Sequence, residues 1–381
     1  MVGAWVVRIG SQCPWPEART WPVGCAVVPR GADDRDVGLP LVELFWLGQQ
    51  RSHSEGRWAE VGLRFKLRTK GRGKVSAWLS HASPYRHVCE SRGVTDSPSR
   101  TLAHSGFQAV VAADRWVPGA YTLVVDGTPQ SHVNLDDPSQ LFFEYVQRMG
   151  HVIDQLGMPG EPITAVHLGA GAFTIPRYIH ATRPGSRQQV IELELDLVDL
   201  VREHLPLPRD AQIRVRHGDA RATLAKLPSG IVGNVDLLVV DVFSGARTPA
   251  HVTSVEFYAE VAAVLAARGV VLVNVADGPG LAFARGQAAT LTSVFGNVAA
   301  LAETQILKGR RFGNVVMVAS PAPLPLEWMP RLLAGGPHPS KVVEGRELSN
   351  WIAGAAVSTD ANAVQSPPPS KSFIQLRGTD T

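Results

Sequence analysis

The sequence has few cysteines, no long apolar run and no leader-like start, and each absence excludes a class of protein. Three cysteines occur in 381 residues, at Cys13, Cys25 and Cys89, and none forms a C-x-x-C pair. Neither a zinc site nor a disulfide framework is therefore indicated. No apolar run approaches the ~18 residues that a membrane span requires, and the first residues do not resemble a signal peptide. We expect a cytoplasmic protein with no metal and no membrane partner.

Several catalytic signatures are also missing. The sequence contains no G-x-S-x-G elbow, no H-E-x-x-H pair and no P-loop, which would indicate esterases, zinc proteases and nucleoside-triphosphate hydrolases. Four histidines fall near the crevice predicted below, and a structural or surface role is expected for each: His167, His180, His217 and His251.

Charge is distributed unevenly along the chain. Residues 1–104 hold 15 Lys and Arg against 9 Asp and Glu, whereas the remainder holds 22 against 25. The first segment also carries six of the nine tryptophans and shows no sustained apolar period. Its basic run "RFKLRTKGRGK" (64–74) is compatible with a nucleic-acid patch. A solvated strand edge or arm is favoured, so we expect an extension of unclear structure, without a catalytic role or a nucleic-acid partner.

Residues 105–150 predict a small β-hairpin region. "YTLVVDGTPQSHVNL" (121–135) has two apolar runs around the turn dipeptide Asp126-Gly127, which is a strong hairpin signal. The next segment, 136–156, has apolar residues at helical spacing. Asp136 and Asp137 are suitable caps for its N-terminus, and Pro138 suits a first turn.

Residues 151–325 alternate strand-like and helix-like patterns, which is typical of a parallel sheet with helices on both faces. We expect an α/β, Rossmann-like domain of the class I methyltransferase type. Helices are expected over 195–204 and 254–267, and 300–320 should form two strands joined by a Gly/Arg turn. The expected strands of the sheet cover 164–170, 188–194, 212–218, 235–242 and 269–276. Residues 326–381 are expected to be a C-terminal segment whose Pro-rich end, "SPPPS" (366–370), is disordered.

The end of the first strand carries a glycine turn, "HLGAGAFTIPRY" (167–178). Gly169 and Gly171 permit a tight strand-to-helix connection and the close approach of a ligand to the backbone. A dinucleotide fingerprint has a third glycine where this chain has Thr174. The turn therefore favours a nucleoside ligand without a pyrophosphate.

Acidic residues follow the next three strands. Glu192 lies 21 residues after Gly171, about the spacing at which an acid reaches a ribose diol, and Glu194 is the nearby alternative. Asp219 is placed to accept from an exocyclic amine such as that of adenine, and Asp241 ends the fourth strand. Because ligands of open α/β sheets bind outside the carboxyl ends of the strands, these acids predict an adenosine site.

These motifs, in this order over about 121–320, resemble the spermidine synthases (aminopropyltransferases). The resemblance is carried by "DGTPQS" (126–131), the glycine turn, Glu192, Gly-Asp-Ala at 218–220, "DLLVVD" (236–241) and "HVTSVEFY" (251–258). It implies a transferase of polyamine biosynthesis that acts on an amine with an S-adenosyl sulfonium donor, decarboxylated S-adenosylmethionine or S-adenosylmethionine. It also implies Asp241 as catalytic residue and a donor pocket formed by Gln130, Gly169, Gly171, Glu192, Asp219, Ala220 and Asp241.

Departures from the family pattern fall on the amine side. The second acid of the family's Asp-x-x-Asp loop is Ser244 here, and the acid of its glycine turn is Ala172. The expected Tyr and Glu after the hairpin are out of register, with Phe142 and Phe143 near that place. A diamine should therefore bind poorly, since each ammonium needs an opposing acid. A methyltransferase with a less charged acceptor and a non-catalytic nucleoside-binding protein stay open, as does a homodimer.

Overall fold

The computed structural model describes residues 97–335 and 339–369, together with the backbone of four short strands nearer the N-terminus. The chain divides into two compact units, Met1–Gly93 and Val94–Thr381. The described strands of the first unit form two antiparallel pairs: β1 (Trp5–Val7) with β2 (Val27–Pro29), and β3 (Leu63–Arg68) with β4 (Lys74–Leu79).

The second unit begins with a four-stranded antiparallel sheet in the order β5-β6-β7-β8. Its strands are β5 (Ser99–Thr101), β6 (Gln108–Ala113), β7 (Ala120–Val125) and β8 (Thr128–Asn134). The predicted hairpin is confirmed, because β7 pairs with β8 across Asp126 and Gly127, which have φ of 49° and 71°, as a two-residue hairpin turn requires. β5 lies inside residues 1–104, so this sheet starts earlier than the sequence predicted.

An eight-stranded sheet follows, in the order β11-β10-β9-β12-β13-β15-β14-β16. The strands from β11 to β13 run parallel, and the remaining neighbours pair antiparallel. The strands are β9 (Thr164–Leu168), β10 (Arg187–Glu192), β11 (Ile213–His217), β12 (Val235–Val240), β13 (Leu265–Asp277), β14 (Asn297–Glu303), β15 (Gly313–Ser320) and β16 (Ser340–Glu344). The predicted fold class is confirmed. From β9 the successive strands are added on one side up to β11, and from β12 they are added on the other side, so the order of the strands switches between β9 and β12. Open α/β sheets bind their ligands at such a switch point.

Successive residues of the central strands face opposite sides of this sheet. In β12, Leu238 and Val240 pack with α5 (Val255–Val264), whereas Leu237 and Val239 pack on the other face. On the first face lie α4 (Ala220–Leu224), α5, α6 (Ala282–Val294) and α9 (Gly345–Ile352); on the second lie α1 (Glu144–Asp154), α2 (Thr174–Thr182) and α8 (Met329–Ala334). Since both faces are covered, the central strand β12 is apolar and buried from Leu237 to Val240.

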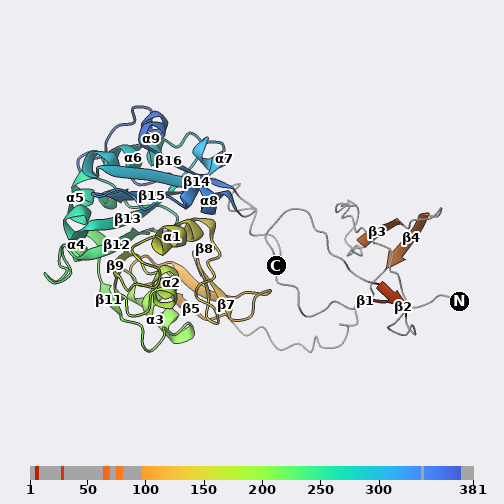
Figure 1. Cartoon of the computed structure of the whole chain (residues 1–381). Coiled ribbons are helices and arrows are strands. Elements are labelled where there is room, and N and C mark those ends of the chain that lie inside the picture. Colours follow the sequence, from red (N-terminus) through yellow and green to blue (C-terminus); the bar gives the residue numbers. More distant parts are fainter. Residues whose placement is uncertain are drawn as a thin grey trace. The chain divides into compact units, whose positions relative to one another are not determined.

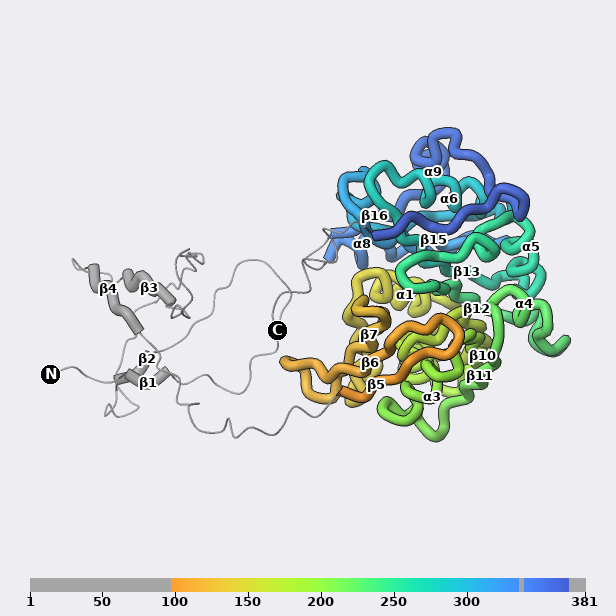
Figure 2. Tube along the Cα trace, turned by 180° about the vertical axis from the view of Figure 1, so that it is seen from behind, coloured from red at the N-terminus to blue at the C-terminus, as the bar shows by residue number. Residues whose placement is uncertain are grey.

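A third apolar cluster joins the small sheet to the large domain. Leu200 and Val201 of α3 (Leu195–His204) pack with Val111 and Leu123 of the small sheet. Figure 1 shows β5 and β7 beside α2 and α3, at the opposite end of the large sheet from β16 and α9. The reverse view in Figure 2 shows the same neighbours, with β5 and β6 lying over α3. The small sheet therefore covers the β9 to β11 end of the large one.

The helix after the hairpin begins later than the sequence predicted. It starts at Glu144, with Phe143 at the N-cap and no side-chain cap. The expected caps lie in a turn instead: Asp136 and Asp137 donate their backbone N–H groups to Asn134 Oδ1 at 3.0 and 3.2 Å. The two aspartates lie in this turn, at least seven residues before Glu144, and therefore do not cap the helix.

The C-terminal segment is part of the fold. β16 adds to the large sheet and α9 packs on it, and α7 (Thr304–Leu307) connects β14 to β15, the predicted antiparallel pair. Ser366 is fully buried, so the expected disorder of 366–370 is wrong up to Pro369, and the rest of the tail lies outside the described residues. In the described part of the chain, helices long and apolar enough to cross a bilayer are absent.

Candidate functional site

The glycine turn after β9 brings three parts of the chain close together. Gly169 has a φ of 93°, and a Cβ atom there would lie 2.3 Å from the backbone oxygen of Asp241. Gly171 has a φ of 48°, and its Cβ would lie 2.3 Å from Ser131 Oγ of β8. Both the backbone conformation and the available space therefore require glycine at these positions.

One cavity is lined by this turn, and a second shares part of its wall. We call the first the sheet-edge cavity (about 190 Å³) and the second the α1 cavity (about 480 Å³). The structure brings all seven residues of the predicted site to the sheet-edge cavity: Gln130, Gly169, Gly171, Glu192, Asp219, Ala220 and Asp241. Gln130, Tyr145 and Phe243 line both cavities. The two cavities are therefore neighbours, and these three residues form the wall that they share.

Glu192, at the end of β10, is fixed by backbone groups. Its Oε2 accepts from Ala170 N at 2.8 Å, and its Oε1 accepts from Glu194 N at 2.9 Å. Burial raises the pKa of this carboxyl, an effect opposed by these backbone hydrogen bonds. A carboxylate oxygen has two lone pairs, so each retains capacity for a ligand hydroxyl. The arrangement can take a diol.

Glu194, the alternative ribose acid, has another partner. Its carboxylate accepts from Ser105 N at 2.8 Å and His104 N at 3.2 Å. It thereby holds the loop after β5, whose residues Leu102, His104, Ser105 and Phe107 line the sheet-edge cavity. Part of the cavity wall thus comes from within residues 1–104, the segment for which no catalytic role was predicted.

Asp219 follows β11 and caps α4. Its Oδ1 accepts from Ala222 N at 2.9 Å, and its Oδ2 lies 2.7 Å from His251 Nε2. Burial alone would raise the pKa of this carboxyl, but the two hydrogen bonds outweigh burial and lower it. Asp219 therefore lines the predicted cavity, and its partner His251 lines the same cavity.

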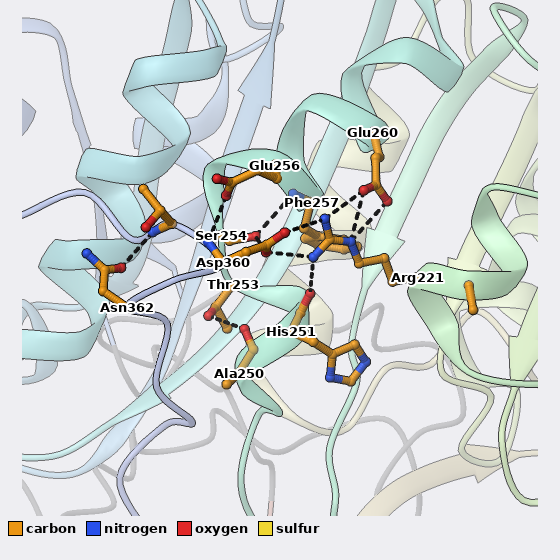
Figure 3. A network of polar contacts seen from close by, with 12 residues as sticks. Arg221, Ala250, His251, Thr253, Ser254, Glu256, Phe257, Glu260, Asp360 and Asn362 are labelled. Atoms are coloured by element: carbon orange, nitrogen blue, oxygen red, sulfur yellow. Dashed lines mark hydrogen bonds and ion pairs between the residues drawn. The ribbon is translucent and has the colours of Figure 1, made fainter.

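Arg221 anchors this end of the cavity (Figure 3). Its guanidinium donates to Glu260 of α5 at 2.7 Å and to Asp360 of the C-terminal segment at 2.7 Å. It also donates to the backbone oxygen of His251 at 3.2 Å. One arginine thus connects α4, α5, the C-terminal segment and the turn η1 (Ala250–Val252) that carries His251.

Asp241, at the end of β12, receives two side-chain donors. Asn274 Nδ2 lies 2.8 Å from its Oδ1, and Tyr145 Oη lies 3.3 Å from its Oδ2. Withdrawal of the carboxyl from water raises its pKa, and the two hydrogen bonds act in the opposite direction. Burial next to Asp241 raises the pKa of the Tyr145 hydroxyl in turn. The carboxylate is thus oriented toward the shared wall of the cavities.

Sequence reasoning missed both partners of Asp241. Asn274 is a buried polar residue within the apolar run of β13, and that contrast was a usable signal. Tyr145 comes from the first turn of α1, whose later start brings it, instead of Phe142 or Phe143, to the acid.

The loop after Asp241 is held from two sides. Gln130 Nε2 donates to Gly245 O at 3.1 Å, which attaches the loop to β8. On the other side, Thr248 N donates to Ser366 Oγ at 2.8 Å, and Arg247 Nε donates to Ser366 O at 2.6 Å. Ser244 is exposed and lines the sheet-edge cavity. The C-terminal segment thus holds in place a loop that lines both cavities.

Ala172 does not occupy the position that the family resemblance implied. It is fully buried in the cluster beneath the small sheet and is not among the residues that line either cavity. The next residue, Phe173, has a φ of 59°, which is costly for a bulky side chain, and its fully buried ring packs in the same cluster. A carboxylate at 172 would need space that the core does not offer.

The four histidines near the crevice have structural partners. Burial lowers the pKa of His167 to about 4, and its Nε2 lies 2.9 Å from Gln188 Oε1. His217 Nε2 lies 3.0 Å from Leu193 O, and His180 Nε2 lies 3.5 Å from Asp210 Oδ1. His251 pairs with Asp219. Within the described ranges, groups of three or more His, Cys, Asp or Glu that could hold a metal ion are absent.

A mostly parallel sheet with a glycine turn after its first strand and acids after the next three strands defines a Rossmann-like fold. Within that class the comparisons point in one direction. A crystal structure of a probable spermidine synthase from Corynebacterium glutamicum superimposes with a TM-score of 0.63 and 28% identity, covering 69% of this chain and 96% of that one. The chain is spermidine synthase-like in sequence and in fold.

Curated relatives agree with this assignment. A polyamine aminopropyltransferase of Neisseria meningitidis is 27% identical over 180 residues, which are 46% of this chain and 66% of that protein. One of Vibrio vulnificus is 25% identical over 136 residues, 35% of this chain and 44% of that protein. The chain thus spans less than two thirds of the length of these relatives. No protein-family profile matches it.

Proposed function

We propose that the protein is an aminopropyltransferase-like enzyme that binds decarboxylated S-adenosylmethionine in the sheet-edge cavity and transfers its aminopropyl group to an amine in the α1 cavity. One observation carries the proposal: Glu192, Asp219 and Asp241 line a cavity at the glycine turn, and Tyr145, the hydrogen-bond partner of Asp241, lines both that cavity and a larger one next to it. The spermidine synthase-like sequence and fold support the same reaction class.

In this proposal Glu192 binds the ribose and Asp219 the adenine amine. A carboxylate that accepts two hydroxyl hydrogen bonds is selective for a diol, and the backbone bonds to Ala170 and Glu194 set its orientation before the ligand arrives. Such preorganisation lowers the cost of binding. The sulfonium would then lie toward Asp241, at the shared wall.

The chemical step requires one neutral amine. Its nitrogen lone pair attacks the carbon bonded to the sulfonium sulfur, and the carbon–sulfur bond breaks with its electron pair moving to sulfur. Methylthioadenosine leaves, and the new secondary ammonium loses one proton. In this proposal Asp241 holds the amine and takes that proton, a role supported by the hydrogen bonds from Tyr145 and Asn274 that orient its carboxylate.

A methyltransferase on the same fold is the second candidate. It is favoured by Ser244, which leaves the loop without a second acid, and by Ala172, which lines neither cavity and carries no acid. Methyl transfer would leave S-adenosylhomocysteine instead of methylthioadenosine, so the nucleoside product separates the two reactions.

The test is an incubation of the purified full chain with each donor and a panel of amines, followed by identification of the nucleoside product. Methylthioadenosine formed in an amine-dependent manner, and lost in Asp241→Asn, supports the proposal. S-Adenosylhomocysteine as the product supports the second candidate. If neither donor is consumed although methylthioadenosine binds, both transferase proposals are wrong and a nucleoside-binding protein is left.

A further inference from the structure

His167, near the end of β9, is a polar side chain in an otherwise apolar stretch of strand. It is only 1% exposed, and it is among the residues that line the sheet-edge cavity. Ala165, two residues earlier, packs on the side of the sheet that α1 and α2 cover, and alternation places His167 on the same side. A buried imidazole has two ring nitrogens, and each is expected to have a hydrogen-bond partner.

Gln188 fixes the tautomer of this imidazole. The amide nitrogen of Gln188 donates to the backbone oxygen of Pro176 at 2.9 Å, so its amide oxygen faces His167. That oxygen lies 2.9 Å from Nε2 of His167 and can only accept, which means that Nε2 carries the proton. Burial lowers the pKa of His167 to about 4, so the ring is neutral at pH 7. Nδ1 is therefore unprotonated and can accept a hydrogen bond.

This acceptor lacks a donor. Nδ1 of His167 is buried and has no hydrogen-bond partner among the residues that the structure describes. The cavity lining on the same side of the sheet includes the apolar side chains of Val146, Ile175 and Val239, which offer no donor. A buried acceptor without a partner lowers stability, so a ligand group with a polar hydrogen would gain by contact with it.

The charges of the sheet-edge cavity favour a positively charged ligand group. Asp241 lies two residues beyond Val239, the β12 neighbour of His167 in the sheet. It also accepts from Tyr145 of α1, so it is on the same side of the sheet as His167. Among the described residues that line this cavity, lysine and arginine are absent, and four carboxylates are present: Glu192, Glu194, Asp219 and Asp241.

We infer that Nδ1 of His167 accepts a hydrogen bond from the ammonium group at the end of the tail of the S-adenosyl substrate. The inference rests on the proposed function, in which Glu192 and Asp219 hold the adenosine part and the sulfonium lies toward Asp241. Both S-adenosyl substrates considered above carry this ammonium, and they differ by one carboxylate. The cavity charges favour the substrate without the carboxylate, because a second negative group would face the acids unpaired.

Three thioethers with the same adenosine part test this contact. Propylthioadenosine, aminopropylthioadenosine and S-adenosylhomocysteine have tails that end in a methyl group, an ammonium, and an ammonium with a carboxylate. None has a sulfonium, so none can act as the group donor. Each is titrated by calorimetry into the full chain at pH 7. We expect aminopropylthioadenosine to bind roughly tenfold more tightly than propylthioadenosine, as a hydrogen bond from a charged group provides, and S-adenosylhomocysteine to bind less tightly than aminopropylthioadenosine.

The variant His167→Leu assigns this preference to the imidazole. It should reduce the advantage of aminopropylthioadenosine to within about twofold and leave the binding of propylthioadenosine unchanged. His180→Leu is the matched control, since His180 is a histidine of α2 outside the cavity lining. If His167→Leu does not fold, the double variant His167→Leu with Gln188→Leu replaces it, because it removes both partners of the buried hydrogen bond.

Nitrogen NMR of the histidine-labelled protein gives a readout that a purely structural role would not change. The Nδ1 signal of His167, identified by its loss in the leucine variant, should be that of an unprotonated nitrogen. It should shift on addition of aminopropylthioadenosine and stay in place on addition of propylthioadenosine. The native protein supplies this result even if neither variant folds.

The outcomes separate the inference from the proposed function. A protonated Nδ1 in the free protein, equal binding of the first two compounds, or an advantage that persists in His167→Leu overturns the inference and leaves the adenosine site standing. Absence of binding by all three compounds overturns the proposed function and the inference with it. Tightest binding of S-adenosylhomocysteine, if lost in His167→Leu, supports the contact and favours the methyltransferase.

Discussion

Replacing Asp241 with asparagine should separate catalysis from stability. The carboxylate accepts from Asn274 at 2.8 Å and Tyr145 at 3.3 Å, and an amide oxygen of the same shape keeps one acceptor. What is lost is the negative charge that holds the amine and takes its proton. General-base assistance is worth roughly 10²–10⁴-fold in rate, so transfer in Asp241→Asn should fall by about that factor.

The same substitution should not weaken the fold. Withdrawal from water raises the pKa of Asp241, which means that the folded state disfavours its ionised form. When the pKa of a carboxyl is higher in the folded state than in the unfolded state, the ionised group lowers the stability of the fold at pH values above the folded-state pKa. This loss of stability is removed as the pH falls through the folded-state pKa. Asp241→Asn should therefore unfold at an equal or higher temperature at pH 7. Its stability should also depend less on pH than that of the native protein above pH 4.

The assay compares single-turnover transfer with calorimetric binding of methylthioadenosine, which is neutral and lacks the sulfonium. Binding should stay within about threefold while transfer falls. Transfer within threefold of the native rate would show that Asp241 is not the base. A large loss of thermal stability would show that its ionised form is instead required by the fold.

Three further results are expected. Removal of residues 1–93 should leave methylthioadenosine binding intact. Removal of residues 1–104 should abolish it, because this longer deletion takes away β5 and two residues that line the sheet-edge cavity. Equal binding by the two shortened proteins would contradict the structure. Gly169→Ala should destabilise the protein by about 1–3 kcal/mol in urea unfolding, from its φ of 93° and the clash with the Asp241 backbone; an unchanged midpoint would refute this. Arg221→Met should lower the melting temperature at pH 7. The hydrogen bond from Arg221 is the main reason why the pKa of Asp360 is lowered to about 2. The stability that this ion pair contributes is therefore present above the ordinary carboxyl pKa of 3.8 and is lost as the pH falls from about 4 to 2. A difference between the two proteins that is as large at pH 2 as at pH 7 would count against the pair.

The sheet and its acids were predictable because both depend on local patterns. Strand-like runs that lead to Glu192, Asp219 and Asp241 indicate parallel strands with their carboxyl ends at one edge, and the structure places all three acids at one cavity. The helix α3 was predicted at its observed bounds, 195–204. The period of the apolar residues was sufficient to predict such a helix, because one continuous face of it packs against the rest of the protein.

Features that depend on contacts of individual side chains were not predictable in the same way. Asn134 organises the turn that holds Asp136 and Asp137, so the start of α1 and the position of Tyr145 followed from a side chain rather than from periodicity. Ser366 reaches Thr248 across 118 residues, and its composition alone indicated disorder. Ala172 aligned with an acidic position of the family, but only the packing of the core shows that it faces neither cavity.

The central claim is that an adenosine-type ligand binds with its ribose on Glu192, and the most direct test is calorimetry of methylthioadenosine with the native protein and Glu192→Gln. Glu347→Gln, an exposed substitution on α9, is the matched control. The account predicts measurable binding to the native protein and the control, and a loss of roughly 10–100-fold in Glu192→Gln, as expected for hydrogen bonds to a charged group. Affinity that is unchanged in a correctly folded Glu192→Gln protein, or the absence of binding to the native chain, would contradict it.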